Sequence, residues 1–276
     1  QQACVDAGVE ALGYIPKDES IVIPSRHLGL SIDETFCFDT FADRVAEVID
    51  KTVNVDRLLE LCTVEFSGEQ TQDVVCFGNR KIAIARDEAF NFMYRENVEA
   101  LKRAGEVVFF SPLRDKSLPE ADMVYFPGGY PELHLAELAA NEGMRQSVRK
   151  YCENGGRVLA ECGGMMYLCD TITDGDGKVY PMAGVLKQGA TMEQMKLKLG
   201  YREVRVNGQR IRGHEFHYSR ILPTNEKIPV IGTIYNAKDM VVDTPVYTYK
   251  NVLASYIHFY WGECGIDHFL MLMSQK

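Results

Sequence analysis

The segment RVLAECGGMMYLC (157–169) carries an apolar run directly into a pair of glycines, and a helix-forming run follows. This order predicts a strand that ends at Cys162, a tight turn over Gly163 and Gly164, and a helix that begins at once. Such a turn can present a nucleophile, because glycines permit a strained backbone and a helix N-terminus favours a thiolate and an oxyanion. The alternative interpretation is a buried structural cysteine beside a glycine turn.

The sequence before this segment alternates between strand and helix patterns. Short apolar runs predict strands, and apolar residues three and four apart predict helices. Strands are expected at 80–86, 106–112, 121–129 and 157–164, and helices at 91–105 and, in two pieces broken near Asn141–Gly143, at 131–154. This alternation predicts an α/β fold with a doubly wound, mostly parallel sheet. Residues 179–257 are rich in strand patterns and predict antiparallel additions.

A domain boundary is expected near the polar stretch SGEQTQD (67–73), which has no periodicity and is typical of a linker. The apolar spacing of 38–62 predicts a helix, and Asn54 or Asp56 could cap a second, shorter one. The apolar run at 21–23 is expected to be a short strand or an extended segment. These elements are too few to enclose a core. We therefore expect residues 1–70 to be the tail of a truncated domain and residues 75–276 to form a second domain.

A second glycine turn, FPGGYPE (126–132), ends the predicted strand that precedes 157–164. Neighbouring parallel strands would bring Gly128 and Gly129 beside Cys162. The backbone N–H groups of this turn could then form an oxyanion hole together with that of Gly163. The alternative is a plain strand-to-helix turn with Pro131 in the first helical position.

A nucleophilic cysteine needs a base, which is usually histidine, and the chain has six. His258 lies in the apolar run ASYIHF (254–259), where a polar side chain is costly unless it has a partner or a role. His214 and His217 flank Glu215 in GHEFHYS (213–219). A strand would place them on opposite faces, which argues against a metal site. The remaining three histidines belong to no recognisable constellation, and His134 is expected at the start of a helix.

Composition excludes several classes of protein. The 276 residues carry 30 basic and 39 acidic side chains, a net charge of −9, and no long basic block, which argues against a nucleic-acid binder. No apolar run approaches the roughly 18 residues of a membrane helix, and the N-terminus lacks a signal-peptide pattern, so we expect a cytoplasmic protein without membrane association. The eight scattered cysteines are expected to be reduced and mostly buried. Neither GxxxxGK[ST] nor GxGxxG occurs, so the chain by itself has no motif for ATP or a dinucleotide.

Taken together, eight ordered motifs make the chain resemble the C-terminal part of the cobyrinate a,c-diamide synthases, which amidate a corrin ring. The motifs are RHLGL (26–30), ARDEAFNF (85–92), FFSPLRD (109–115), PGGYPELH (127–134), AECGGMMYL (160–168), LGYREV (199–204), GHEFHYS (213–219) and ASYIHFYWG (254–262). The resemblance implies a flavodoxin-like domain of the class I glutamine amidotransferase type, preceded by the tail of a P-loop synthetase domain. It also implies cobalamin biosynthesis as the setting.

In the whole protein, the resemblance implies that the synthetase domain uses ATP and Mg²⁺ to activate a carboxylate of a cobyrinate-type tetrapyrrole. The amidotransferase domain supplies ammonia from glutamine, so this chain is expected to act as a glutaminase without a cofactor of its own. Cys162 is implied as the nucleophile, His258 as the base, and Gly128, Gly129 and Gly163 as the turn that binds glutamine and the oxyanion. A homodimer is compatible with the sequence.

The chain departs from many triad amidotransferases at one position. Such enzymes have Glu two residues after the histidine, whereas Tyr260 stands there in this chain. The third member is therefore absent or comes from elsewhere, with Glu215 and Glu263 as candidates. We have no residue-level role for GHEFHYS, and the DEAF segment (87–90) is a candidate for the synthetase interface or the ammonia route.

Other functions remain open at this stage. Cobyric acid synthase and the nickel-sirohydrochlorin diamide synthase are rivals within the class, because the sequence does not separate the macrocycles. A hydrolase or redox protein could use the same Cys turn without glutamine, although the PGGYPE turn and a distal histidine favour a glutaminase. A non-catalytic binding module with a relict site is the third class, and the intact Cys162–His258 pair counts against it. A lowered Cys162 pKa would favour catalysis.

Overall fold

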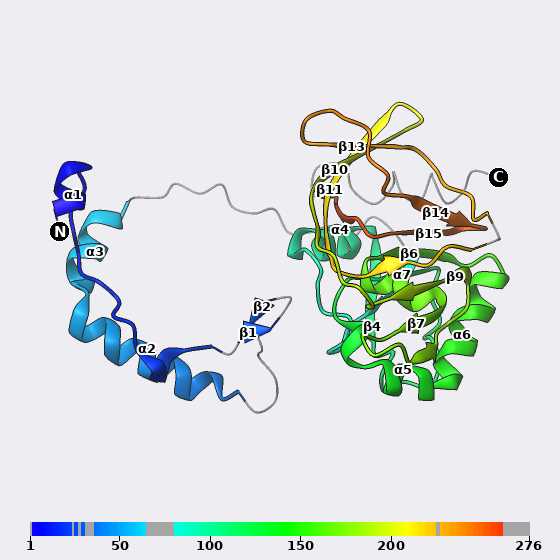
Figure 1. Ribbon diagram of the computed structural model, residues 1–276, viewed down its shortest axis with the longest axis horizontal. Coiled ribbons are helices and arrows are strands. Elements are labelled where there is room, and N and C mark those ends of the chain that lie inside the picture. Colours follow the sequence, from blue (N-terminus) through cyan, green and yellow to red (C-terminus); the bar gives the residue numbers. More distant parts are fainter. Residues whose placement is uncertain are drawn as a thin grey trace. The chain divides into compact units, whose positions relative to one another are not determined.

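The computed structural model describes residues 2–23, 25–26, 29–30, 36–64, 80–224 and 227–261. They belong to two compact units, Gln1–Gln72 and Asp73–Lys276, which are described separately (Figure 1). The polar stretch 67–73, Glu263 and two of the three remaining histidines, His27 and His268, lie outside the described residues.

The first unit consists of short elements around two longer helices. They are α1 (Gln2–Asp6), the 3-10 turn η1 (Glu19–Ile21), the paired strands β1 (Ser25–Arg26) and β2 (Gly29–Leu30), α2 (Phe38–Thr52) and α3 (Val55–Cys62). The second helix predicted after 38–52 is confirmed, and the Asn54 side chain caps it by accepting from the Arg57 N–H (3.0 Å). The apolar run at 21–23 forms no strand, because Ile21 ends the 3-10 turn that Asp18 caps. Neither α2 nor α3 contains a buried residue.

The second unit is built on a six-stranded sheet. Its strands are β3 (Arg80–Ala85), β4 (Gly105–Phe110), β5 (Met123–Phe126), β6 (Arg157–Glu161), β14 (Val246–Tyr249) and β15 (Val252–Ser255). The order is β14-β15-β6-β5-β3-β4; all neighbours are parallel except β14, which pairs antiparallel with β15. Numbered along the chain, the five parallel strands have the order 2-1-3-4-5, which is the flavodoxin-like arrangement. The predicted α/β fold with a mostly parallel sheet is confirmed.

Helices connect the parallel strands much as the periodicity predicts. They are α4 (Arg95–Ala104), the 3-10 turn η2 (Pro131–Leu133), α5 (Leu135–Ala140), α6 (Glu142–Glu153) and α7 (Gly163–Leu168). The predicted break in 131–154 falls at Asn141, between α5 and α6. Helix α4 begins at Arg95 rather than at residue 91, because Phe92 is used differently: its N–H donates to the Gly128 carbonyl (3.0 Å).

Two smaller sheets account for most of the predicted strand-rich region. Its strands β14 and β15 join the main sheet instead, and β15 pairs parallel with β6 rather than as the antiparallel addition expected. One smaller sheet has the order β13-β10-β11-β16 and is antiparallel throughout; the other has the order β12-β9-β7-β8 and contains one parallel pair, β7 with β9. Their bounds are β7 (Cys169–Thr173), β8 (Val179–Pro181), β9 (Leu186–Thr191), β10 (Lys198–Val206), β11 (Gln209–His217), β12 (Arg220–Ile221), β13 (Thr233–Asn236) and β16 (His258–Tyr260).

The main sheet is covered on both faces, as alternate residues along its strands show. Val158 and Ala160 of β6 belong to a core with α5, α6, α7 and the β7–β9 sheet, whereas Leu159 belongs to a second core. That second core contains Leu101 of α4 and apolar residues of the β10–β11–β16 sheet. The layers therefore place the antiparallel sheet against the face of the main sheet opposite to α5 and α6 (Figure 1). In open α/β sheets, functional sites lie at the carboxyl ends of the parallel strands, which here include the ends of β5 and β6.

Among the cysteines that the structure describes, the expected burial is found only in the second unit. Cys152, Cys162 and Cys169 are buried there, whereas Cys37 and Cys62 of the first unit are exposed. Within the described ranges, no helix is both long and apolar enough to cross a membrane.

Candidate active site

Cys162 occupies the sharp turn between β6 and α7. Its backbone has φ 46° and ψ −107°, a left-handed conformation that is rare for a residue with a side chain. The Cys162 N–H donates to the Ser255 carbonyl (2.7 Å), and its carbonyl accepts from the Met166 N–H (3.0 Å). The turn is thus held from β15 and from the first turn of α7, and this is the strand–turn–helix that RVLAECGG predicts.

The second glycine turn lies against His258 and also against Gly163, the residue that follows Cys162. A Cβ atom added to Gly128 would lie 2.2 Å from Cε1 of His258, and one added to Gly163 would lie 3.3 Å from the Gly129 nitrogen. Gly129 itself has φ 153° and packs so closely on the Ala89 carbonyl that a Cβ there would lie 2.2 Å from the oxygen. The predicted proximity of the two glycine turns is confirmed, and it brings the Gly129 and Gly163 backbone nitrogens to the same corner of the sheet.

The apolar run ASYIHF does not form one strand, and His258 lies outside the strand of the main sheet. That strand stops at Ser255, the chain turns through Tyr256 and Ile257, and His258 starts β16 in the antiparallel sheet. The change of sheet carries the imidazole across to the glycine turn. His258 is 4% exposed.

Two rings pack against the His258 imidazole. The His214 ring stacks on it with a centroid distance of 4.9 Å and an interplanar angle of 20°, and the Phe92 ring meets it edge-on at 4.6 Å. Register explains the first contact, because His214 of β11 pairs with His258 of β16. Tyr94 holds the second histidine through a hydrogen bond between its hydroxyl and His214 Nδ1 (2.7 Å).

These contacts give a role to two motifs that sequence reasoning left unexplained. GHEFHYS supplies the histidine that stacks on His258, and the segment just after DEAF supplies Phe92 and Tyr94. Asp87 of DEAF caps its own turn by accepting from the Ala89 and Phe90 N–H groups. No local pattern indicates that residues 87–94 and 213–219 lie close together, so the sequence alone did not reveal the packing of Phe92 and His214 around His258.

Burial sets the protonation of the two candidate groups. It raises the pKa of the Cys162 thiol, Glu132 raises it further, and the Gly163 N–H acts in the opposite direction. Burial, followed by the neighbouring His214 and His217, lowers the pKa of His258 to about 3. The lowered Cys162 pKa that would favour catalysis is therefore not found: desolvation outweighs the short helix α7, and the resting pair is a neutral thiol and a neutral imidazole. A neutral imidazole is the form that can accept the thiol proton.

Comparison with known proteins identifies the domain that carries this geometry. Residues 81–264 match the family model described as the CobB/CobQ-like glutamine amidotransferase domain, which is more than half of the chain. The chain belongs to this amidotransferase family. The fold around Cys162 is accordingly that of a CobB/CobQ-like glutamine amidotransferase domain.

Two curated relatives extend the match into the first unit. The chain is 34% identical to the cobyrinate a,c-diamide synthase of Salmonella typhimurium, over 91% of this chain and 58% of the relative. It is 36% identical to the hydrogenobyrinate a,c-diamide synthase of Pseudomonas aeruginosa, over 93% of this chain and 58% of that protein. The chain thus spans about three-fifths of the length of these relatives. A solved glutamine amidotransferase aligns at 24% identity with a TM-score of 0.48, covering 70% of this chain and 99% of its own.

The third member of a triad is not supplied by Glu215 in this amidotransferase. Its carboxylate accepts from Arg202 Nη2 (2.6 Å) and from the Thr244 hydroxyl (2.8 Å), on the face of β11 opposite to His214. Tyr260 lies two residues beyond His258, and its ring meets that of Tyr94 (5.5 Å). Within the described residues His258 Nδ1 is buried without a hydrogen-bond partner.

The remaining motif histidine, His217, belongs to a separate buried cluster. Its ring stacks on Tyr256 (3.6 Å, 4°), and its Nδ1 donates to the Ser219 carbonyl (2.8 Å), since a carbonyl can only accept. The Ser219 hydroxyl in turn donates to the Tyr256 oxygen (3.0 Å). His214 and His217 therefore face opposite sides of β11, as a strand requires. No cluster of three or more metal-ligating side chains occurs among the residues that the structure describes.

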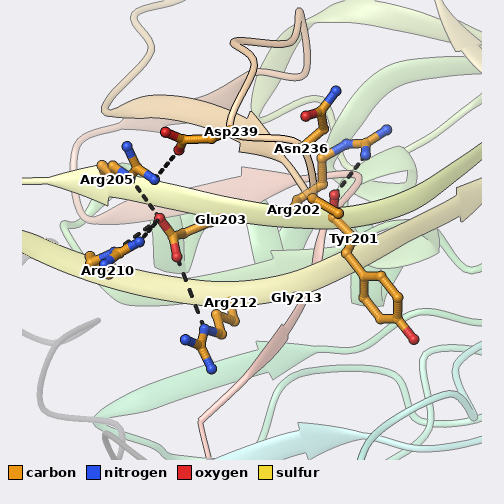
Figure 2. A pocket seen from close by; sticks show the side chains of 10 residues that line it. Tyr201, Arg202, Glu203, Arg205, Arg210, Arg212, Gly213, Asn236 and Asp239 are labelled. Atoms are coloured by element: carbon orange, nitrogen blue, oxygen red, sulfur yellow. Dashed lines mark hydrogen bonds and ion pairs between the residues drawn. The ribbon is translucent and has the colours of Figure 1, made fainter.

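A hollow of about 410 Å³ opens on the antiparallel sheet beside these motifs. Figure 2 shows Arg205, Arg210 and Arg212 converging on the carboxylate of Glu203, and Arg205 also pairs with Asp239. The guanidinium groups are thus largely neutralised by the hollow's own carboxylates. This network ties β10, β11 and the loop after β13 to one another.

Proposed function

We propose that the chain is the glutaminase half of an ATP-dependent amidotransferase that converts the a- and c-carboxylates of cobyrinate to amides. The observation that carries the proposal is the left-handed Cys162 at the β6–α7 turn, beside a glycine turn that packs on a caged His258. The 34% identity to a cobyrinate a,c-diamide synthase supports the substrate. The setting is corrin biosynthesis in the cytoplasm.

In this proposal Cys162 and His258 carry the chemistry. The thiol sulfur attacks the side-chain amide carbon of glutamine while His258 takes the thiol proton. The tetrahedral oxyanion accepts hydrogen bonds from the Gly129 and Gly163 N–H groups, and Gly128 leaves room for the imidazole. The C–N bond then breaks, and His258 returns the proton to the departing ammonia. Water hydrolyses the thioester, which releases glutamate and the free thiol.

ATP and Mg²⁺ belong to the remaining part of the whole enzyme in this proposal. The chain has no phosphate-loop sequence of its own, so the proposal assigns the nucleotide to the part of the relatives that this chain does not cover. Residues 1–70 are proposed to be the end of the synthetase domain, and residues 75–276 the amidotransferase domain. Ammonia leaves the Cys162 site and attacks the activated carboxylate held by the synthetase domain.

The test is glutamate release from glutamine by the wild type, Cys162→Ala and His258→Ala, with Cys152→Ala as a matched buried-cysteine control in α6. We expect the rate of glutamate release to fall at least about a hundredfold in both Cys162→Ala and His258→Ala, because nucleophile and base act on the same bond. The Cys152→Ala control should keep its activity. If the chain alone releases no glutamate, the assay is repeated on a fusion with the ATP-binding domain of a relative, in the presence of ATP, Mg²⁺ and cobyrinate. Silence there too would overturn the proposal in favour of a relict binding module.

A second candidate substrate has its own support, since the chain is 36% identical to a hydrogenobyrinate a,c-diamide synthase. The fusion is therefore supplied with cobyrinate or hydrogenobyrinate in parallel, and diamide formation is followed by mass spectrometry. A clear preference for hydrogenobyrinate would replace cobyrinate in the proposal and leave the glutaminase mechanism intact.

A further inference from the structure

Strand β16 carries His258, and along one edge of this strand side chains satisfy the backbone hydrogen-bonding groups. In the part of the chain that the structure describes, β16 pairs with β11 alone. The Phe259 N–H donates to Glu161 Oε1 (3.2 Å), and the Phe259 carbonyl accepts from Asn97 Nδ2 (2.7 Å). Asn97 Oδ1 also accepts from the Trp261 N–H (2.9 Å). Two side chains thus make the bonds that a further strand would make.

Glu161 is an unusual residue for this environment. Its side chain is 1% exposed, and its second oxygen accepts from the Tyr125 hydroxyl (2.8 Å). Both donors are neutral groups, and burial raises the pKa of the Glu161 carboxyl to about 8. A buried carboxyl without a cation is costly, so packing alone does not explain why it stands here. The position of Glu161 offers an explanation, because this residue immediately precedes Cys162 in the chain.

We propose that Glu161 is a positioning residue, which ties the backbone beside His258 to the strand end that carries Cys162. The inference rests on the proposed glutaminase function. Asn97 of α4 is the second anchor of the same edge, through the Phe259 carbonyl and the Trp261 N–H. The pair fixes the thiol–imidazole geometry through the backbone of β16.

A hydrogen bond to the backbone of β16 can position His258 without a carboxylate on its imidazole. In a triad a carboxylate holds the imidazole by its second nitrogen. Here Nδ1 of His258 has no such partner among the described residues, and Tyr260 stands where the carboxylate is usual. Stacking by His214 and Phe92 restrains the tilt of the ring but not the position of its strand. The hydrogen bond from Phe259 to Glu161 restrains that position, and a displacement of about 1 Å can lower a rate about a hundredfold.

The experiment compares Glu161→Met with Glu161→Gln in steady-state glutamate release. Met fills the volume but offers no acceptor to the Phe259 N–H, whereas the Gln amide oxygen can accept it and the amide nitrogen can donate to Tyr125. We expect Glu161→Met to lower kcat about 10- to 100-fold with KM for glutamine within about 2-fold, and Glu161→Gln to restore kcat to within about 3-fold. The assay uses the form of the protein, chain or fusion, in which the wild type is active.

A matched control separates positioning from general stability. Asn141 is also buried and bridges two backbone carbonyls, of Pro112 and Asp115, far along the chain from β16. Asn141→Leu is expected to lower the urea midpoint while kcat, measured where the protein is folded, stays within about 2-fold. Equal kcat losses in Asn141→Leu and Glu161→Met would overturn the inference.

The outcomes also distinguish the inference from the proposed function. Inactivity of the wild type in both forms would overturn the function, and the inference with it. An active wild type, an inactive Cys162→Ala and full kcat in folded Glu161→Met would overturn the inference alone. If Glu161→Met does not fold, Asn97→Ala serves instead, because it removes the other anchor of β16. Full kcat in folded Asn97→Ala would then count against positioning through this edge.

Discussion

At the scale of single residues, the conformation of Cys162 is the most informative feature. A residue other than glycine at φ 46° carries strain of about 1–3 kcal/mol, which the surrounding structure must offset. Its backbone hydrogen bonds to Ser255 and Met166 supply part of that offset. Strained backbone of this kind clusters at active sites, and Cys162 is followed directly by Gly163, which packs against the second glycine turn.

The strain predicts an order of stability for two inactive variants. Both Cys162→Ala and Cys162→Gly lack the thiol, but glycine adopts a positive φ without a steric penalty. We expect Cys162→Gly to be more stable than Cys162→Ala by about 1 kcal/mol in urea unfolding, after allowing for the greater flexibility of glycine in the unfolded chain. A Cys162→Ala variant that is the more stable of the two would show that the turn is not strained.

At the scale of elements, the site depends on how closely α7 approaches the end of β5. A Cβ added to Gly164 would lie 2.3 Å from the Phe126 carbonyl oxygen. Since that oxygen belongs to the backbone, no side-chain rotation can relieve the contact. Helix α7 can therefore start directly behind Cys162 only because glycine stands in its first turn.

This approach predicts the effect of adding one methyl group. Gly164→Ala should destabilise the protein by about 1–3 kcal/mol, because β5 and α7 must separate, and it should lower glutamate release as the two turns move apart. Gly175→Ala is the matched control, since a Cβ there meets nothing within 4 Å. Thermal unfolding and the glutaminase assay measure both effects. Equal stability of the two variants would contradict the close packing of α7.

At the scale of the whole molecule, neutral buried histidines link stability to pH. Burial lowers the pKa of His214, His217 and His258, the last to about 3. An unfolded histidine titrates near pH 6.5, so on acidification the unfolded chain binds the proton first. The stability contributed by these groups is complete above about pH 6.5 and is lost as the pH falls towards 3. Glu161 acts with the opposite sign, because its raised pKa makes stability fall as the pH rises from about 4.5 to about 8.

The pH dependence can be assigned to His258 by one substitution. His258→Gln keeps a polar side chain that does not titrate, so it should lose less stability than the wild type between pH 7 and pH 5. The difference in slope should not exceed about 1.4 kcal/mol per pH unit, the limit for one proton. Urea midpoints at the two pH values measure it, and comparison with the wild type at each pH cancels the contribution of Glu161. Parallel curves would mean that His258 is not buried in its neutral form.

The sequence by itself determined the elements that local pattern controls. The strands expected at 80–86, 106–112 and 157–164, which form β3, β4 and β6, and the glycine turns beside Cys162 follow from runs and breaks only a few residues long. From their alternation the parallel sheet follows, and with it the meeting of two strand ends at one edge. The helix cap at Asn54 was equally local.

Only the tertiary structure decided how the histidine is placed. The break at Tyr256–Ile257, the pairing of His214 with His258 and the arrival of Phe92 depend on contacts between segments that lie far apart in the sequence. Burial, which raises the pKa of Cys162, is likewise a property of the packed layers. Local propensity fixes a strand and its turn, but packing between distant elements fixes register, solvent exposure and therefore protonation.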